Sequence, residues 1–436
     1  MKTILITSFH PLISRNILFS PVLDLLRASG VRVVVIGRTK KKEFFKKELP
    51  CVEVVSLERK LNAGDRFLRY LSLAGLPTDS IKLKQKTEMK GSGRFLSLWF
   101  RGWFARQSVR LIFKILIRGT RDFISILDEV HPDLIFSTDI QHPSDLGLFA
   151  AARRKKISIA GMVRSWDNPT SKGLIGVVPD ILLVHNRLVK SEVEALHKIL
   201  PSKIRVVGVP HYDEYDPMHA EKTESFYKKT GLDPKRPFLL FTPTGDRYIS
   251  NNTVDRDILD MLDKILPSEY QILVRFPFTD TVAYLDNKKN YGRIFFDRPE
   301  MNFELHKNNE LSKEGEKHLR LTLALCSLVV TGPSTICIDA AIFDKPIILI
   351  AFDGREKRKP LESIARYYMY DHWKPIHASE GASFAGSEQE LATLIERYIR
   401  NPALHSGGRK KIVETELEYT DRKSSERVAD VLKSML

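Results

Sequence analysis

The sequence predicts an α/β protein built from two Rossmann-like βα domains, each with its own parallel sheet. Three observations favour this fold class. The chain has 436 residues, which is more than one ordinary hydrophobic core accommodates. Apolar, β-branched segments alternate with amphipathic segments along most of its length, as expected where helices cover both faces of a parallel sheet. A polar stretch at residues 211–225 interrupts this alternation, which then begins again.

In the first half, each expected strand is a short run of β-branched and aliphatic residues, and the helices between them carry apolar residues at helical spacing. The expected strands cover residues 3–8, 31–37, 52–57, 133–139, 157–163, 181–186 and 204–210. The expected helices lie at 17–28, near 144–154 and near 187–199.

The second half repeats the pattern, with expected strands at 237–245, 270–276, 292–297, 327–332 and 346–352. The last segment, 421–436, is an amphipathic helix with Ser424 or Ser425 as its cap, and we expect it to return to the first domain. The predicted boundaries are 1–212 for the first domain, 213–225 for a linker, 226–420 for the second domain and 421–436 for the C-terminal helix.

The composition argues against several classes of protein. The three cysteines lie far apart, which argues against a disulfide framework or a metal site and suits a reducing compartment. No run reaches about 18 uninterrupted apolar residues, so we expect no membrane-spanning helix. The first residues, MKTILITSFHPL, predict a strand and not a signal peptide.

The segment VVTGPSTICIDAAIFDKPII, residues 329–348, joins an expected strand to an expected helix through a tight turn. The start of such a helix offers free N–H groups and a partial positive charge at the edge of the sheet where ligands bind. Ser334 and Thr335 are candidates to cap this helix and to bind a phosphate. Asp339, just over one turn further, is a candidate to accept hydrogen bonds from a sugar. The alternative is that Ser334 only caps the helix and Asp339 faces water.

This string resembles the nucleotide-diphosphate signature of GT-B glycosyltransferases, and within that superfamily the chain is most similar to CDP-glycerol glycerophosphotransferase-like proteins. The stretches SWDNPTSKG, VVGVPHYDEY and DRKSSERV support the resemblance. It implies two domains facing each other across a cleft, with the donor on the second domain and the acceptor on the first. It also implies a CDP- or UDP-linked donor that basic side chains and a helix N-terminus bind without a metal ion or other cofactor.

The donor-binding residues that the resemblance implies come from three strand ends of the second domain. Three departures are visible, since Asp339 stands where the family usually has Glu, Asp344 stands where Gly is common, and Arg275 is followed by Phe276 where His-Pro is common. Arg275 would then contribute more to phosphate binding. The expected set is Thr244, Arg247, Arg275, Gly332, Pro333, Ser334, Thr335 and Asp339.

Polar side chains also follow three expected strands of the first domain, where an acceptor hydroxyl would need a general base. The candidates for this catalytic role are His10, Asp139, His142 and Asp167. Ser171 and Lys172 are candidates to bind an anionic acceptor group or phosphate. For each residue taken singly, the alternative is a capping or loop-ordering role.

The formal charge of +15 is concentrated in one segment, because residues 81–121 contain eleven Lys or Arg against one acid, Glu88. A basic stripe beside apolar residues is typical of a helix that lies on an anionic membrane. The alternative is a domain helix with a solvated basic face. No nucleic-acid-binding module accompanies the charge. The expected membrane residues are Trp99, Phe100, Trp103, Phe104, Arg106, Arg110, Lys114 and Arg118.

These observations predict a cytoplasmic transferase on the inner face of the cell membrane. It would move a glycosyl or glycerophosphate group from a nucleotide-diphosphate donor to a glycan or lipid-linked acceptor in surface polysaccharide synthesis. Two alternatives stay open. One is a nucleotide-sugar epimerase of the UDP-GlcNAc 2-epimerase type, which shares the fold. The other is a non-catalytic nucleotide-binding protein.

Overall fold

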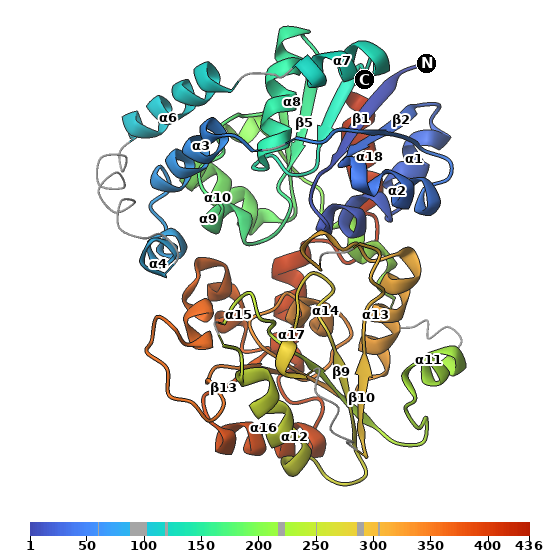
Figure 1. The fold of residues 1–436 in the computed structure, drawn as a ribbon, viewed down its shortest axis with the longest axis vertical. Helices are drawn as coiled ribbons and strands as arrows, with labels where there is room; N and C mark the ends of the chain where they lie inside the picture. Colours follow the sequence, from blue (N-terminus) through green and yellow to red (C-terminus); the bar gives the residue numbers. More distant parts are fainter. Residues whose placement is uncertain are drawn as a thin grey trace. The chain divides into compact units, whose positions relative to one another are not determined.

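The computed structural model describes residues 1–59, 61–87, 103–117, 121–216, 223–249, 251–285, 292–303 and 306–436. They form two compact units (Figure 1). Unit 1 comprises Met1–Glu214 and Thr415–Leu436, and unit 2 comprises Tyr215–Glu414. Each unit is a parallel sheet with helices on its two faces, as the alternating sequence pattern predicts.

The sheet of unit 1 has the order β3-β2-β1-β4-β5-β6-β7 among the described residues. Leu5 in β1 packs into one core, whereas Ile4 and Ile6 pack into the core on the opposite face, which is why this strand is apolar throughout. The strand order reverses between β1 and β4: from β1 the first strands are added on one side, and from β4 the later strands are added on the other. Ligands of open parallel sheets bind beside such a switch point. The strands are β1 (Thr3–Ser8), β2 (Arg32–Gly37), β3 (Glu53–Ser56), β4 (Leu134–Ser137), β5 (Ser158–Met162), β6 (Ile181–Val184) and β7 (Ile204–Val206).

Helices cover this sheet and connect its strands (Figure 1). Between β1 and β3 in the chain come η1 (Ser14–Leu18), α1 (Val22–Ala28), η2 (Thr39–Lys41) and α2 (Lys42–Glu48), and β3 is followed by α3 (Ala63–Ala74) and α4 (Asp79–Thr87). The remainder are α6 (Trp103–Leu116), α7 (Arg121–Val130), α8 (Pro143–Arg154), α9 (Asn168–Ser171), α10 (Arg187–His197), η3 (Pro201–Lys203), η4 (Pro210–Glu214) and α18 (Ser424–Ser434).

The C-terminal helix α18 returns to unit 1 as predicted, and its residues Val428 and Leu432 join the core that contains α1. Its cap differs from the prediction. The Asp213 carboxylate accepts hydrogen bonds from the backbone N–H groups of Ser424 (3.0 Å) and Ser425 (2.6 Å), whereas neither serine side chain caps the helix. An acid from another segment therefore satisfies the first amides of this helix, and its charge also suits the helix dipole.

Unit 2 has the sheet order β10-β9-β8-β11-β12-β13 among the described residues, so its switch point lies between β8 and β11. Its strands are β8 (Phe238–Thr242), β9 (Gln271–Arg275), β10 (Ile294–Asp297), β11 (Leu328–Thr331), β12 (Ile347–Ile350) and β13 (Ser383–Ala385). Its helices are α11 (Thr223–Thr230), α12 (Val254–Ile265), η5 (Ala283–Leu285), η6 (His306–Asn308), α13 (Lys313–Leu325), α14 (Ile336–Ile342), η7 (Ile364–Met369), η8 (Asp371–Trp373), α15 (Lys374–Ser379), α16 (Glu388–Arg400) and α17 (Ser406–Leu417).

The stretch expected to be a linker is partly structured. Asp213 belongs to η4 and holds α18, so the first unit extends to Glu214, two residues beyond the predicted boundary. Helix α11 begins at Thr223, inside the expected linker. The second boundary also differs, because unit 1 resumes at Thr415 and not at residue 421.

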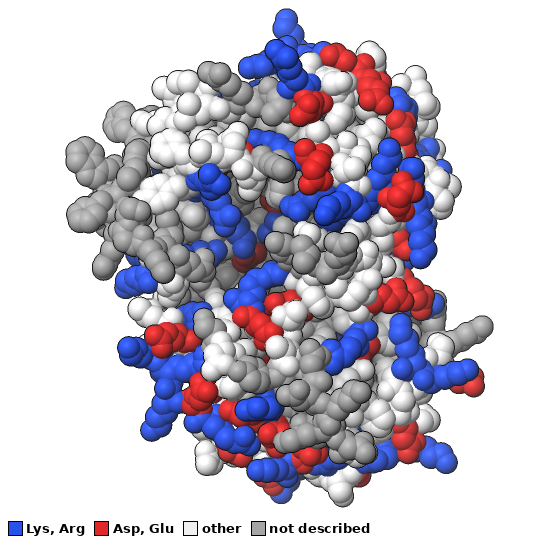
Figure 2. All heavy atoms as spheres, viewed as in Figure 1, with Lys and Arg blue, Asp and Glu red and all other residues white. Residues whose placement is uncertain are grey.

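Of the basic segment 81–121, the structure describes residues 81–87 in α4, residues 103–117, which contain α6, and Arg121 at the start of α7. Figure 2 shows Lys and Arg side chains spread over the face that it draws, with Asp and Glu side chains between them. Arg110 corrects the prediction of one exposed basic stripe. Its side chain is buried and donates hydrogen bonds to the carbonyl oxygens of Ile175 and His197. Trp99, Phe100 and Arg118 lie outside the described residues, and only the backbone of Trp103 and Phe104 is described. Among the described residues, no helix is both long and apolar enough to cross a bilayer.

Candidate functional site

The predicted donor-binding residues of unit 2 follow three adjacent strands. Thr244 follows β8, Arg275 ends β9, and the turn from Gly332 to Thr335 follows β11. Since the strands are parallel, these residues lie at the same edge of the sheet, on both sides of the switch point. The hydroxyls of Thr242 and Thr331, 2.6 Å apart, link the ends of β8 and β11 just below this edge.

The loops after β8 and β11 pack directly against each other. A Cβ atom added to Gly332 would lie 2.1 Å from the Thr244 hydroxyl oxygen, so only glycine fits there. The first loop is held from the other side by buried Asp255, whose carboxylate accepts from the amides of Thr244 (2.8 Å) and Gly245 (3.1 Å). Burial raises the pKa of Asp255 above its usual range. The sequence analysis missed this aspartate.

Asp255 belongs to an Asp-x-Asp pair at the start of α12, a spacing that also occurs in metal sites. Here both members bind loops of the protein, because Asp257 accepts from the backbone N–H (3.1 Å) and guanidinium (3.0 Å) of Arg355. Among the described residues, no three His, Cys, Asp or Glu side chains are grouped as metal ligands.

The turn that precedes α14 has the polar groups expected of a helix start. The Ser334 hydroxyl accepts weakly from the backbone N–H of Ile336 (3.4 Å), and Thr335 is exposed. Asp339 lies deeper than expected. It is 1% exposed, and one of its carboxylate oxygens accepts a hydrogen bond from the hydroxyl of Tyr215 (2.9 Å). Its contact with a sugar stays a prediction, and the structure shows a tyrosine hydroxyl at the same carboxylate.

Arg275 is buried in an ion pair with Asp297, its neighbour on β10. His318 on α13 lies 3.1 Å from the other oxygen of this carboxylate. Burial by itself would raise the pKa of Asp297, but Arg275 and His318 outweigh it and lower the pKa to about 2. A pocket of unit 2 opens beside this cluster. It is lined by Lys229, Arg275, Asp297, Arg298, Pro299, Glu300, Leu311, Ser312, Gly315 and His318.

Arg247 binds its own loop region. Its guanidinium donates to the carbonyl oxygen of Thr279 (2.6 Å), and its backbone N–H donates to the Asp280 carboxylate (3.1 Å). Its predicted contact with a phosphate stays a prediction. In the structure it connects the loop after β8 to the loop after β9.

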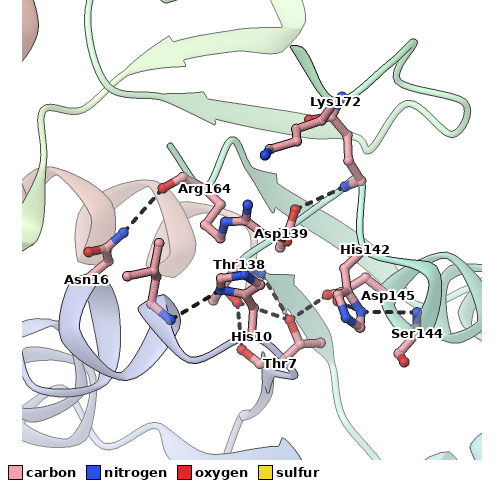
Figure 3. A network of polar contacts seen from close by, with 12 residues as sticks. Thr7, His10, Asn16, Thr138, Asp139, His142, Ser144, Asp145, Arg164 and Lys172 are labelled. Atoms are coloured by element: carbon pink, nitrogen blue, oxygen red, sulfur yellow. Dashed lines mark hydrogen bonds and ion pairs between the residues drawn. The ribbon is translucent and has the colours of Figure 1, made fainter. Parts of the chain in front are cut away.

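In unit 1, three of the four predicted catalytic residues lie together at the carboxyl edge of β1 and β4 (Figure 3). His10 follows β1, and Asp139 and His142 follow β4, on either side of the switch point. Figure 3 also shows Arg164, after β5, directed toward Asp139, with which it forms a buried ion pair. Arg164 was not among the predicted site residues.

Both histidines have one ring nitrogen occupied by the backbone. His10 Nδ1 accepts from the backbone N–H of Leu12 (3.2 Å), and His142 Nδ1 accepts from that of Ser144 (3.2 Å). A neutral ring that accepts at Nδ1 carries its proton on Nε2. Burial, followed by the charge of Arg164 and the neighbouring His142, Lys41 and Lys172, lowers the pKa of His10 to about 2. His10 therefore presents a neutral N–H donor.

His142 is in the same state. Burial lowers its pKa to about 4; Asp139 opposes this shift, and the charges of Arg38, Arg164 and Arg59 add to it. In this conformation, neither histidine offers the free ring nitrogen that a general base needs.

The other two base candidates are carboxylates with cationic partners. Asp139 is 3% exposed and paired with Arg164. Asp167 lies 3.1 Å from Lys172 and accepts from the Ser171 hydroxyl (3.0 Å), and its side chain is 20% exposed. Ser171 and Lys172, expected to bind an anionic group, thus bind Asp167 in the structure. Of the two carboxylates, Asp167 is the more accessible.

Asp145, at the start of α8, lies beneath this edge and was not predicted. One of its oxygens accepts from the hydroxyls of Thr7 (2.5 Å) and Ser137 (2.7 Å), which joins β1 to β4 (Figure 3). Its other oxygen lies 3.7 Å from His142 Nδ1. Burial, with a smaller contribution from Asp139, raises the pKa of Asp145 to about 8, so the group is protonated near neutral pH. The only signal in the sequence is its position in TDIQHPSD, three residues after His142.

The neutral state of the histidines gives a testable expectation. In protein labelled with ¹⁵N-histidine, the ring signals of His10 and His142 should report the Nε2–H tautomer throughout pH 5–8, because both folded pKa values lie below this range. Since the unfolded rings take up a proton near pH 6.5, this pair should also lower stability as the pH falls below about 6.5. Signals that titrate between pH 6 and 7 would contradict the assignment; His10→Gln and His142→Gln identify each signal.

The family relationship follows from comparison with known proteins. Residues 177–434, more than half of the chain, match the model of the CDP-glycerol:poly(glycerophosphate) glycerophosphotransferase family. The chain belongs to this family. The matched region contains all the predicted donor-binding residues of unit 2, whereas His10, Asp139, His142 and Asp167 precede it. Compared by sequence with curated proteins, the chain has no significant match.

Solved structures share the fold at low sequence identity. UDP-GlcNAc 2-epimerase from Neisseria meningitidis bound to UDP-GlcNAc is 12% identical, with a TM-score of 0.59 and 100% of both chains covered. A glycosyltransferase from Rickettsia africae is 13% identical, with a TM-score of 0.51 and 100% and 98% covered. The wall teichoic acid polymerase TagF is 12% identical, with a TM-score of 0.55 and 100% of this chain and 89% of TagF covered. These likenesses establish the two-domain GT-B-like α/β fold.

Proposed function

We propose that this family member transfers a glycosyl or glycerophosphate group from a CDP- or UDP-linked donor to a glycan or lipid-linked acceptor in surface polysaccharide synthesis. The observation that carries the proposal is the paired loop edge of unit 2, where Gly332 packs on Thr244 within the matched family region. Backbone amides at a strand-to-helix turn suit a diphosphate. The UDP-GlcNAc bound to the Neisseria epimerase supports a nucleotide-diphosphate donor.

Asp167 is the general base in this proposal. It is more exposed than Asp139, and the two histidines have their Nδ1 atoms occupied. The acceptor hydroxyl would give its proton to Asp167 as its oxygen attacks the donor. If glycerophosphate is transferred, the bond to the leaving phosphate breaks and a nucleoside monophosphate is released. If a sugar is transferred, the glycosidic bond breaks and a nucleoside diphosphate is released.

The place of action in this proposal is the inner face of the cell membrane, with the protein bound peripherally. The concentration of eleven basic residues between positions 81 and 121 supports it, because such a segment is attracted to anionic lipids. The phosphates of the leaving nucleotide would be stabilised by the turn at 332–335 and by basic side chains, without a metal ion.

An epimerase is the second candidate, favoured by the epimerases among the structural neighbours. The two activities differ in their products, because an epimerase needs no acceptor and does not release a nucleotide with each turnover. The protein is incubated with a nucleotide sugar in the absence and in the presence of a membrane fraction. A nucleotide sugar inverted at C2 that forms without the membrane fraction identifies the epimerase, and nucleotide release that depends on the membrane fraction identifies the transferase.

Donor binding is tested by calorimetric titration with CDP, UDP, CDP-glycerol and UDP-GlcNAc. We expect at least one of them to bind, and we expect Gly332→Ala to weaken its binding at least about tenfold, because the new methyl group displaces the Thr244 loop. Gly292→Ala is the matched control, since a Cβ atom there meets nothing within 4 Å. Absence of binding by every nucleotide in the set, or equal binding by both variants, contradicts the proposal.

A further inference from the structure

Helices α3 and α6 expose an unusual number of large apolar side chains. Within the described residues of unit 1, seven such side chains are exposed, and five belong to α3, α6 or the residue just before the α3 cap. Leu61 and Phe67 are 48% and 47% exposed, and Leu111, Ile115 and Leu116 are 58%, 64% and 46% exposed. The other two are Met1 and Leu200. Apolar side chains gathered in this way mark an interaction surface.

The orientation of α6 is fixed from its inner side. Val109 and Phe113 are buried in the core of unit 1, and a Cβ atom at Gly176 would lie 2.2 Å from the Phe113 ring. Arg110 donates to two backbone carbonyls on the same side. Leu111 and Ile115, one turn apart, therefore occupy the centre of the outward face, where a solvated helix would have polar residues.

The exposed charges on helices α3 and α6 have one sign. Arg66 and Arg69 of α3 and Lys114 of α6 are exposed, and the sequence of α6 contains no acid. Among the residues of α3, the one acid is Asp65, which pairs with Arg59 (2.6 Å) and caps its own helix. The two helices thus combine exposed apolar side chains with exposed positive charge.

We propose that this α3–α6 surface, defined by Leu61, Phe67, Leu111, Ile115 and Leu116 with Arg66, Arg69 and Lys114, inserts into the headgroup region of an anionic lipid bilayer. The proposal rests on the membrane location proposed above and names the surface that makes the contact. The apolar side chains would enter the boundary of the acyl chains while the cations bind lipid phosphates.

Charge argues against the other occupants. A second copy docked by the same surface would bring two sets of cations together, with a repulsion that a symmetric interface does not relieve. Nucleic acid would gain little from Leu111 and Ile115, since its bases stack on aromatic or guanidinium groups. An anionic bilayer satisfies both the apolar and the basic groups.

The test is sedimentation of the full chain with vesicles of phosphatidylglycerol and phosphatidylcholine, and with vesicles of phosphatidylcholine alone. We expect binding to the anionic vesicles that weakens with salt, and a loss of at least about tenfold in the double variant Leu111→Ser and Ile115→Ser. Leu200→Ser is the matched control, because Leu200 is also 64% exposed but lies before η3. Since all these side chains are exposed, thermal unfolding should be unchanged.

Equal binding by the double variant and the control would overturn the proposal, as would equal binding of the wild type to neutral vesicles. A wild-type dimer in sedimentation velocity that the double variant abolishes would also overturn it, in favour of a second copy. Nucleotide titration of the wild type separates the two proposals. Binding of anionic vesicles without binding of any nucleotide leaves this surface intact and rejects the transferase, whereas nucleotide binding without vesicle binding rejects the surface alone.

Discussion

Asp167→Asn is expected to lower the rate of transfer by about 10²–10⁴-fold, the usual contribution of a general base. The amide keeps the shape of the side chain and an oxygen that accepts from Ser171, but it cannot take the proton of the acceptor hydroxyl. Donor affinity should change by less than about twofold, because the predicted donor-binding residues belong to unit 2. The measurement is nucleotide release from the donor that binds, in the presence of a membrane fraction as acceptor.

The control for this variant is Asp128→Asn, an exposed aspartate of unit 1 that pairs with Lys155. It should leave the rate unchanged. Transfer at the wild-type rate by Asp167→Asn would exclude Asp167 as the base. If His10→Gln then proved as inactive as His10→Ala, the histidine would be the base and the neutral-donor assignment would be wrong, because glutamine supplies an N–H donor at the position of Nε2.

Arg275→Met is expected to destabilise unit 2 by about 3–5 kcal/mol, the usual effect of removing one partner from a buried ion pair. The substitution leaves the Asp297 carboxylate buried with His318 as its neighbour. Arg400→Met is the matched control, since its pair with Glu396 is exposed on α16 and should contribute less than about 0.5 kcal/mol. Hydrogen exchange of unit 2 peptides measures the difference. Equal protection in the two variants would contradict the structural role of Arg275.

The same ion pair predicts how the free energy of unfolding depends on pH. The folded pKa of Asp297 is about 2, below its unfolded value of about 3.9, so the folded state binds this proton less readily. The pair therefore contributes its full stabilisation above about pH 5 and loses it as the pH falls through 4 toward 2. In Arg275→Met the loss of stability that this pair causes between about pH 5 and pH 2 should be absent. The same dependence of stability on pH in the variant and the wild type would contradict the stabilising role of the Arg275–Asp297 pair.

The alternation of apolar and amphipathic segments predicted both sheets, because a parallel strand covered on two faces is apolar throughout. The strand β1 shows why, since Ile4 and Leu5 enter opposite cores. The short edge strand β13 (Ser383–Ala385) was missed, because three residues give no periodicity. Helices α3 and α4 were missed as well.

The site was predictable only in part. Positions after strands predicted His10, Asp139 and His142 at a sheet edge, because carboxyl ends of parallel strands share one edge. Arg275, at the end of β9, was expected from the family resemblance. Their partners were not predictable, since Asp297 is 22 residues from Arg275 and Tyr215 is 124 residues from Asp339. The burial of Arg110 has a simpler cause. Arg110 is adjacent in α6 to Val109 and three residues from Phe113, both buried, so its side chain lies at the margin of the buried face of the helix.

The central claim, that the loops after β8 and β11 bind a nucleotide diphosphate, is tested most directly by hydrogen exchange with and without saturating CDP or UDP. Binding should slow exchange in peptides covering residues 243–247 and 331–338, and should leave peptides of α16 unchanged. A nucleotide that binds and protects neither loop would contradict the claim.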